Sequence, residues 1–246
     1  MPRWKRVLFK LSLRLRLAAR MLSSFEDSFG RGRMRISFAQ DGEDLIAWRL
    51  LHELGIPLPR YLDIGANDPE HLSNTALFHL LGATGVNIEP EPALHAQLVR
   101  CRPRDLNLNL GIGPANGVLT FHRMDNPSLS TFSAAEAERL IRDEGVTLRD
   151  RISIPVRRIR EVLEEQKFQP DFMSIDVEGS ELAILESYDW DQHRPGVICV
   201  ETVGYSRRGD KPRETGTRAL LESQGYVQAA QTLCNSLFID WKYRRP

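Results

Sequence analysis

The sequence predicts an α/β protein with a doubly wound, Rossmann-like and mostly parallel sheet, an antiparallel hairpin at the C-terminal edge, and an amphipathic helix ahead of the sheet. The first observation is an apolar strand over 61–64 that runs into Gly65 and is followed by a helix and a second strand ending on Glu89. The second is that strand and helix patterns keep alternating along the chain. The third is the connection between the last two strands, 226–230 and 236–241, which is too short for a crossover helix and makes them antiparallel.

Length, composition and charge limit the class of protein. With 246 residues, 41% of them hydrophobic, the chain can form one sizeable domain with a full core. A formal net charge of zero argues against a general nucleic-acid binder. The cysteines show neither zinc-site spacing nor a disulfide framework, and no run of about eighteen apolar residues occurs. The sequence therefore predicts a cytoplasmic protein without a membrane span.

Residues 1–37 differ in charge from the domain expected over 38–246. The first 35 residues hold ten Lys and Arg but only two acidic residues. Over 3–22, apolar residues recur at helical spacing with basic residues largely on the other side, which predicts an amphipathic helix before a linker. Three interpretations stay open. The helix could attach the protein peripherally to an anionic membrane, namely the inner membrane surface, or it could dock on the domain or on a second copy of the chain. The third interpretation is a mitochondrial presequence.

The remaining elements follow from periodicity, caps and glycine stops. An acidic first turn opens a helix over 40–54, and a helix capped by Ser73 or Asn74 ends at Gly82. Residues 123–133 are expected to form a loop. The other expected helices are 91–100, 134–143, 159–166, one that ends at Glu186, and 213–223, and the other expected strands are 84–88, 105–110, 118–122, 152–156, 171–176 and 196–200.

The turn after the first strand distinguishes two classes of ligand. A dinucleotide site needs a G-x-G-x-x-G turn, and only Gly65 is present. Asp63, Asn67 and Asp68 surround this turn with acceptors, which would repel a pyrophosphate but suit the ammonium and sulfonium groups of S-adenosylmethionine. Glu89 lies about twenty residues further on, where a carboxylate can accept hydrogen bonds from ribose hydroxyls. An ordinary strand-to-helix turn is the alternative.

The chain resembles the FkbM-type methyltransferases from about residue 40 to residue 239. The resemblance is carried by Leu62–Asn67, Ser73–Thr75, Asn87–Pro90, Met173–Glu181 and Cys199–Glu201. Its most specific part is the block Ile-Asp-Val-Glu-Gly-x-Glu within 175–181. The resemblance implies the class I, S-adenosylmethionine-dependent fold and O-methylation of a hydroxyl on a sugar, a glycan or a natural product. Pro69 departs from the glycine that many members carry, so the turn near the methionine end of the cofactor is expected to differ.

The candidate site residues follow from the strand ends together with this resemblance. Asp63, Glu89, Asp176 and Glu201 each end a predicted strand, and the carboxyl ends of parallel strands share one edge of the sheet, so they should line one cleft. An alcohol needs a base or a metal ion to become a nucleophile, which makes Asp176 and Glu178 the predicted catalytic residues. Asp176, Glu178 and Glu201 are the candidate ligands of a divalent ion. The residues expected to bind S-adenosylmethionine are Asp63, Gly65, Ala66, Asn67, Ser73, Asn74, Glu89 and Asp176.

Two other functions were weighed against methyl transfer. The missing glycines disfavour a nucleotide-binding oxidoreductase of the Rossmann type. A non-catalytic, membrane-associated binding protein that kept the fold would be expected to lose the acids at the sheet edge, and here they are present. Glu181 is expected to have a structural role at the start of the helix that follows it. The partner is therefore expected to be a small-molecule or glycan acceptor and not a nucleic acid.

Overall fold

The computed structural model describes residues 36–206 and 212–244. The described residues from Ser37 onward form one compact unit. The helix predicted over 3–22 lies outside the described residues, so it stays a prediction. Of the helices in the described part of the chain, none combines the length and the apolar character needed to cross a membrane.

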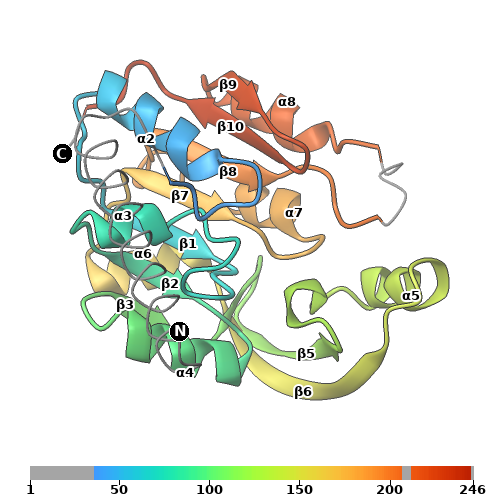
Figure 1. The fold of residues 1–246 in the computed structure, drawn as a ribbon. Helices are drawn as coiled ribbons and strands as arrows, with labels where there is room; N and C mark the ends of the chain where they lie inside the picture. The colour runs from blue at the N-terminus through green and yellow to red at the C-terminus, as the bar shows by residue number, and fades with distance from the viewer. Residues whose placement is uncertain (1–35, 207–211, 245–246) are drawn as a thin grey trace, which may run out of the picture. The chain divides into compact units, whose positions relative to one another are not determined.

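Within the described residues, a seven-stranded sheet forms the centre of the unit (Figure 1). Its strands are β1 (Tyr61–Ile64), β2 (Gly85–Ile88), β3 (Leu106–Leu108), β7 (Phe172–Ile175), β8 (Val197–Glu201), β9 (Val227–Gln231) and β10 (Asn235–Ile239). Their order is β3-β2-β1-β7-β8-β10-β9. The strands from β3 to β8 are parallel, whereas β10 is antiparallel to both of its neighbours. The predicted mostly parallel sheet with an antiparallel C-terminal hairpin is confirmed.

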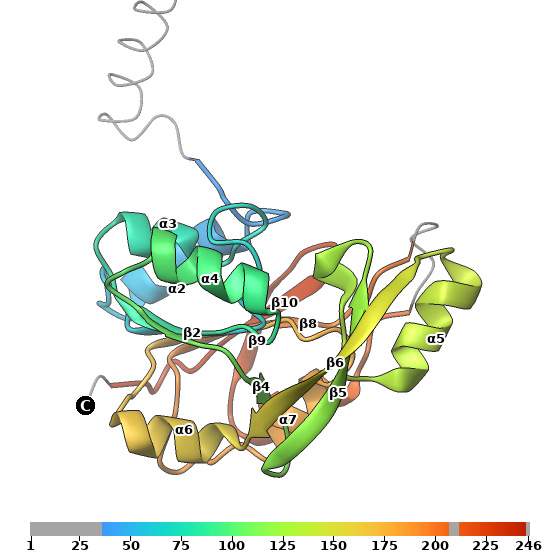
Figure 2. The same ribbon diagram turned by 90° about the horizontal axis from the view of Figure 1, so that it is seen from below.

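Helices cover both faces of this sheet (Figures 1 and 2). One face carries α2 (Glu43–Glu53), α3 (Ala76–Leu80) and α4 (Pro92–Cys101), and the other carries α6 (Ile159–Gln166), α7 (Glu181–Glu186) and α8 (Gly216–Ser223). Successive side chains of a strand point to opposite faces, so each face has its own apolar cluster. Tyr61 and Phe172 pack on the side of α2, while Leu62 and Met173 pack on the side of α6 and α7. The core is therefore formed in two layers around the central strands.

The strands predicted over 118–122 and 152–156 do not join the main sheet. They are the antiparallel strands β5 (Gly117–Met124) and β6 (Leu148–Arg157), and β6 also pairs with β4 (Gly111–Ile112), a short strand that the sequence did not indicate. These three strands form a separate sheet, and α5 (Ala134–Asp143) connects β5 to β6 (Figure 2). Much of β5 and β6 is exposed to solvent, which is compatible with an antiparallel sheet and not with the buried centre of a parallel one. These strands are therefore not part of the predicted doubly wound sheet.

The helix expected after Ser73 or Asn74 begins slightly later. Thr75 is the residue before the first turn of α3, and its side chain makes no capping bond. The Oγ of Ser73 instead accepts a hydrogen bond from the N–H of Ala76 at 3.2 Å, and the Nδ2 of Asn74 donates to Ser174 at 3.1 Å. Both residues named in the sequence therefore stabilise the approach to α3, but neither occupies its N-cap position.

Two further helices start later than predicted. α2 begins at Glu43 and α8 at Gly216, where the carboxylate of Glu214 accepts hydrogen bonds from the first N–H groups.

The acidic first turn of α2 does more than interact with the helix dipole. Glu43 is buried and accepts a hydrogen bond from the Nδ2 of Asn235 at 3.0 Å, across 192 residues of chain. Glu43 therefore connects α2 to the hairpin of β9 and β10 at the far end of the sequence. The predicted loop 123–133 contains a short 3-10 helix, η1 (Pro127–Leu129).

Candidate active site

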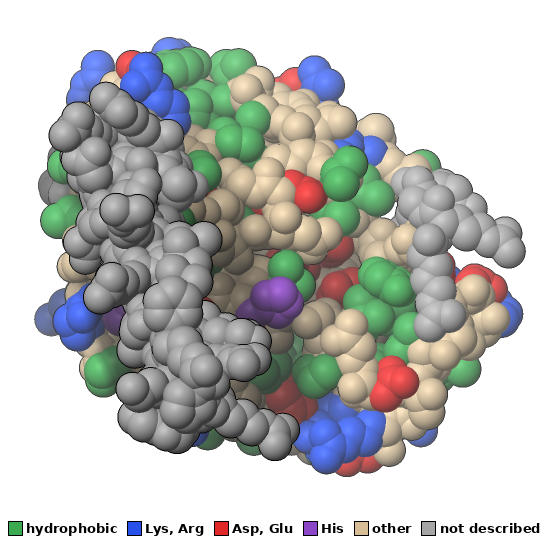
Figure 3. Space-filling model, in the orientation of Figure 1, with side chains coloured by type: hydrophobic (Ala, Val, Ile, Leu, Met, Phe, Trp, Pro, Cys, Tyr) green, Lys and Arg blue, Asp and Glu red, His purple; other side chains and the backbone are tan. Residues whose placement is uncertain are grey.

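A cleft opens at the carboxyl ends of the parallel strands, where open α/β sheets bind their ligands. Its volume is about 490 Å³, within the range of roughly 300–1,000 Å³ that is typical of small-molecule sites. Figure 3 shows acidic side chains gathered around the hollow at the centre of this face. Within 36–206 and 212–244, no Lys or Arg lines the cleft, so its walls favour a ligand that carries positive charge. The carboxylates that line it are Asp63, Glu89, Asp176, Glu178 and Glu201.

The turn after β1 brings the backbone of the first motif against the end of β7. Gly65 has a φ of 82°, and a Cβ atom at this position would lie 1.8 Å from the backbone oxygen of Asp176. Only glycine allows this approach, so Gly65 is required for packing whether or not a ligand is bound. The N–H groups of Gly65 and Ala66 both donate to the carbonyl of Ile88, at 2.9 and 3.1 Å. The turn is thus held between β2 and β7.

Asp63 lies below this turn in a buried network. Its Oδ2 accepts a hydrogen bond from the hydroxyl of Thr75 at 2.5 Å. Burial raises the pKa of Asp63, and the positive charge of Arg102 opposes that rise. Arg102 is 1% exposed and donates to Thr75 at 2.7 Å, to Ser73 at 2.8 Å, and to the carbonyl of Pro69 at 3.1 Å. No motif in the sequence indicates Arg102, which anchors the turn containing Pro69.

Glu89, at the end of β2, is buried, and backbone donors fix both of its oxygens. Its Oε2 accepts the N–H of Asn67 and its Oε1 the N–H of Glu91, each at 2.7 Å. Burial is the main reason that the pKa of Glu89 is raised, to about 7, and the two N–H groups act against the rise. Each carboxylate oxygen can accept two hydrogen bonds, and each oxygen of Glu89 accepts one from the backbone. One acceptor position on each oxygen therefore remains for a ligand. This arrangement matches the two hydroxyls of a ribose.

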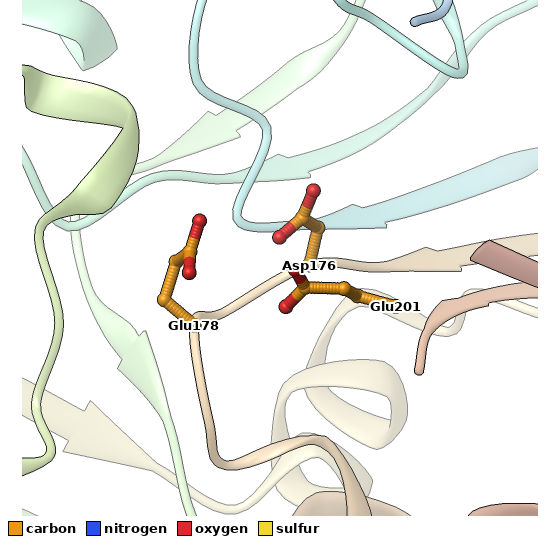
Figure 4. A group of neighbouring side chains, drawn as sticks. All are labelled: Asp176, Glu178 and Glu201. Carbon is orange, nitrogen blue, oxygen red and sulfur yellow. The ribbon is translucent and has the colours of Figure 1, made fainter. Parts of the chain in front are cut away.

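The three acids at the ends of β7 and β8 face one another across the cleft. Figure 4 shows Asp176, Glu178 and Glu201 pointing toward a common centre, and one oxygen of each lies within 4.8 Å of the others. Two oxygens bound to one hard divalent ion lie at most about 4 to 5 Å apart, so the spacing is compatible with such an ion. The side chain of Asp176 is exposed to the cleft, and the protein atoms around it still reduce its solvation. This desolvation, followed by the charges of Glu181, Asp63 and Glu43, raises its pKa to about 7.

The loop between β7 and α7 holds Glu178 in an unusual conformation. Glu178 has a φ of 57°, which non-glycine residues seldom adopt. The carboxylate of Glu181 accepts hydrogen bonds from the N–H of Val177 at 2.9 Å and of Gly179 at 3.1 Å. The hydroxyl of Thr131 donates to the carbonyl of Glu178 at 2.8 Å. Glu181 therefore has a structural role, but its carboxylate binds the turn before α7, which presents Glu178, and does not cap the helix as expected.

The opposite wall of the cleft comes from residues 123–133, the segment expected to form a loop. Residues 126–130 and Phe132 line the cleft next to the first motif. The Nδ2 of Asn67 donates to the Oγ of Ser128 at 2.9 Å, which ties this wall to the turn after β1. Asn67 is among the residues expected to bind the cofactor, and its side-chain amide also contacts this wall. No motif in the sequence indicated this contact, because it joins residues 61 positions apart.

The structure brings every predicted site residue to this one cleft. Asp63, Gly65, Ala66, Asn67, Ser73, Asn74, Glu89, Asp176, Glu178 and Glu201 all line it. The family model for the methyltransferase FkbM domain matches residues 63–227. This range includes the turn at Gly65, the block over 175–181 and the three facing acids. No curated protein matched the sequence.

Proposed function

The chain belongs to the FkbM methyltransferase family, and from this premise we propose that it transfers the methyl group of S-adenosylmethionine to a hydroxyl of a sugar, a glycan or a natural product. The family assigns methyl transfer, which sets aside the oxidoreductase alternative. The observation that carries the proposal is a cleft lined by five carboxylates, with no Lys or Arg among its described lining residues. Such a surface suits a cofactor that carries a sulfonium and an ammonium group.

Different residues at the edge of the sheet fit different parts of this cofactor. Glu89 has acceptor positions left for two ribose hydroxyls, and the apolar side chains of Ile88 and Leu110 line the cleft next to it. Asp63 and Asp176 place negative charge near the turn after β1. When bound, S-adenosylmethionine supplies an electrophilic methyl group on a sulfonium. The ribose is therefore assigned to Glu89 and the cationic part of the cofactor to the Asp63–Asp176 side.

The chemistry on the protein side is positioning and removal of one proton. The acceptor oxygen must approach the methyl group in line with the bond that breaks, while its hydroxyl proton leaves. Asp176, with a pKa of about 7, can accept that proton near neutral pH. The second way to activate the hydroxyl is a divalent ion held by Asp176, Glu178 and Glu201, whose oxygens have suitable spacing. Either way, Asp176 is the residue on which the transfer depends.

Replacing Glu89 by alanine should weaken binding of S-adenosylhomocysteine by about tenfold or more, because buried ribose hydroxyls would lose a charged acceptor. Isothermal titration calorimetry on the full-length protein measures this. Glu70→Ala is the matched control, since Glu70 is exposed and lies outside the cleft. Glu89→Gln, which keeps one acceptor oxygen, should give an intermediate affinity. Equal affinity in the unchanged protein and in Glu89→Ala would place the cofactor elsewhere.

We further propose that residues 3–22, which lie outside the described residues, hold the enzyme at an anionic membrane surface. Each basic residue near such a surface contributes about 1 kcal/mol. Lys10→Gln together with Arg14→Gln should therefore reduce sedimentation with anionic vesicles by about an order of magnitude. Neutral vesicles should bind little of either protein, and added salt should weaken the attraction. A variant that sediments like the unchanged protein but loses a self-association would assign the helix to a subunit contact instead.

A further inference from the structure

Arg123, on β5 of the small sheet, joins that sheet to the edge of the cleft. Its Nε donates to the Oε2 of Glu91 at 2.5 Å and its Nη2 to Oε1 at 2.8 Å, which makes a two-bond fork. Its Nη1 donates to the Oδ2 of Asp150 on β6 at 3.0 Å. Glu91 is 5% exposed, so the ion pair is largely shielded from water. Contacts of this kind constrain both partners far more than exposed pairs do.

Glu91 is the residue whose backbone orients Glu89. The N–H of Glu91 donates to one oxygen of Glu89 at 2.7 Å, while the N–H of Asn67 holds the other oxygen. The carboxylate of Glu91 also accepts from the N–H of Ala93 at 3.4 Å, at the start of α4. The fork from Arg123 therefore fixes a residue that is bonded directly to the predicted ribose acceptor.

We propose that Arg123 is a positioning residue for cofactor binding. Through its ion pair with Glu91, Arg123 holds the carboxylate of Glu89 in its ribose-binding orientation. This inference rests on the proposed function, because it concerns the ribose-binding role of Glu89. It also gives the small sheet a second task. Besides lining the cleft through Phe121, that sheet braces the cofactor side of the cleft.

The charges around Glu89 distinguish this role from packing alone. Besides burial, the negative charges of Glu91 and Asp63 raise the pKa of Glu89. Arg123 forms an ion pair with Glu91 and compensates its charge. Removing the guanidinium would leave Glu91 buried and uncompensated beside Glu89, so the pKa of Glu89 should rise further. An ionised carboxylate binds a ribose diol better than a protonated one. Affinity for S-adenosylhomocysteine should thus increase with pH, and the midpoint of that increase should move upward.

Calorimetric titration of the full-length protein with S-adenosylhomocysteine, between about pH 6 and pH 8.5, tests this. Arg123→Met should weaken binding about tenfold and move the midpoint upward by about half a pH unit. Arg123→Lys keeps the charge but cannot form the two-bond fork. Its midpoint should therefore equal that of the unchanged protein, while its affinity should lie between those of the unchanged protein and Arg123→Met. Arg149→Met, at an exposed arginine on β6, should change neither quantity.

Unchanged affinity and midpoint in Arg123→Met would overturn the inference. So would a weaker binding whose midpoint does not move, because that result describes a purely structural role. If Arg123→Met fails to fold, Arg123→Gln, which also removes the charge, is judged by the same two measurements: weaker binding with a raised midpoint supports positioning, and any other result overturns it. An unchanged protein that does not bind S-adenosylhomocysteine would overturn the proposed function together with this inference, whereas normal binding in every Arg123 variant would overturn only the latter.

Discussion

Replacing Asp176 by asparagine should lower methyl transfer by about 10²-fold or more while the protein stays folded. Asparagine has nearly the same shape but can neither accept the hydroxyl proton nor contribute a charged ligand to a metal ion. The measurement is transfer of a labelled methyl group to an acceptor that the unchanged protein methylates. Glu186→Gln, at an exposed acid on α7, is the matched control and should retain its rate. A variant with near-normal turnover would remove Asp176 from the chemistry.

Stability separates this chemical role from a folding defect. The pKa of Asp176 is raised in the folded protein, so its ionised form destabilises the fold as pH rises from its ordinary value through about 7. Asp176→Asn removes that charge, and its unfolding temperature at pH 8 should therefore equal or exceed that of the unchanged protein. A chelator then distinguishes the two mechanisms: activity lost on chelation and restored by magnesium indicates the metal ion, and activity that survives chelation indicates the base.

Replacing Arg102 by methionine should lower the free energy of unfolding by about 3–5 kcal/mol. Its buried guanidinium donates to Pro69, Ser73 and Thr75, and its charge compensates that of Asp63. Methionine can fill part of the space but leaves these acceptors without donors and the carboxylate without a counter-charge. Urea denaturation followed by circular dichroism gives the free energy and the m-value, and an unchanged m-value would show that the same folded state is being compared.

Two variants test the cause of this loss. Arg100→Met replaces an exposed arginine two positions earlier on α4 and should change stability by no more than about 0.5 kcal/mol. Asp63→Asn combined with Arg102→Met should cost less than the sum of the single changes, because the first removes the charge that the second leaves uncompensated. A loss in Arg102→Met no larger than that in Arg100→Met would contradict the buried network, and strict additivity would contradict its electrostatic part.

The main sheet and the acids of the cleft could be predicted from the sequence because their signals are local. A buried strand, a glycine and a terminal acid are adjacent in the chain, and parallel strands bring their carboxyl ends to the same edge whatever lies between them. Asp63, Glu89, Asp176 and Glu201 were placed on one cleft by that rule alone, and the structure places them there. The near-continuous burial of the central strands agrees with a parallel sheet that helices cover on both faces.

Only the tertiary structure decided how the polar groups of the cleft are paired. Arg102 and Arg123 have no motif, and the strand patterns over 118–122 and 152–156 do not indicate which sheet these strands join. Ser128 reaches Asn67 across 61 residues, and Thr131 reaches Glu178 across 47. A local pattern reports which side of an element is apolar, whereas the partner of a buried polar group depends on which distant segment packs against it, and no short stretch of sequence contains that information.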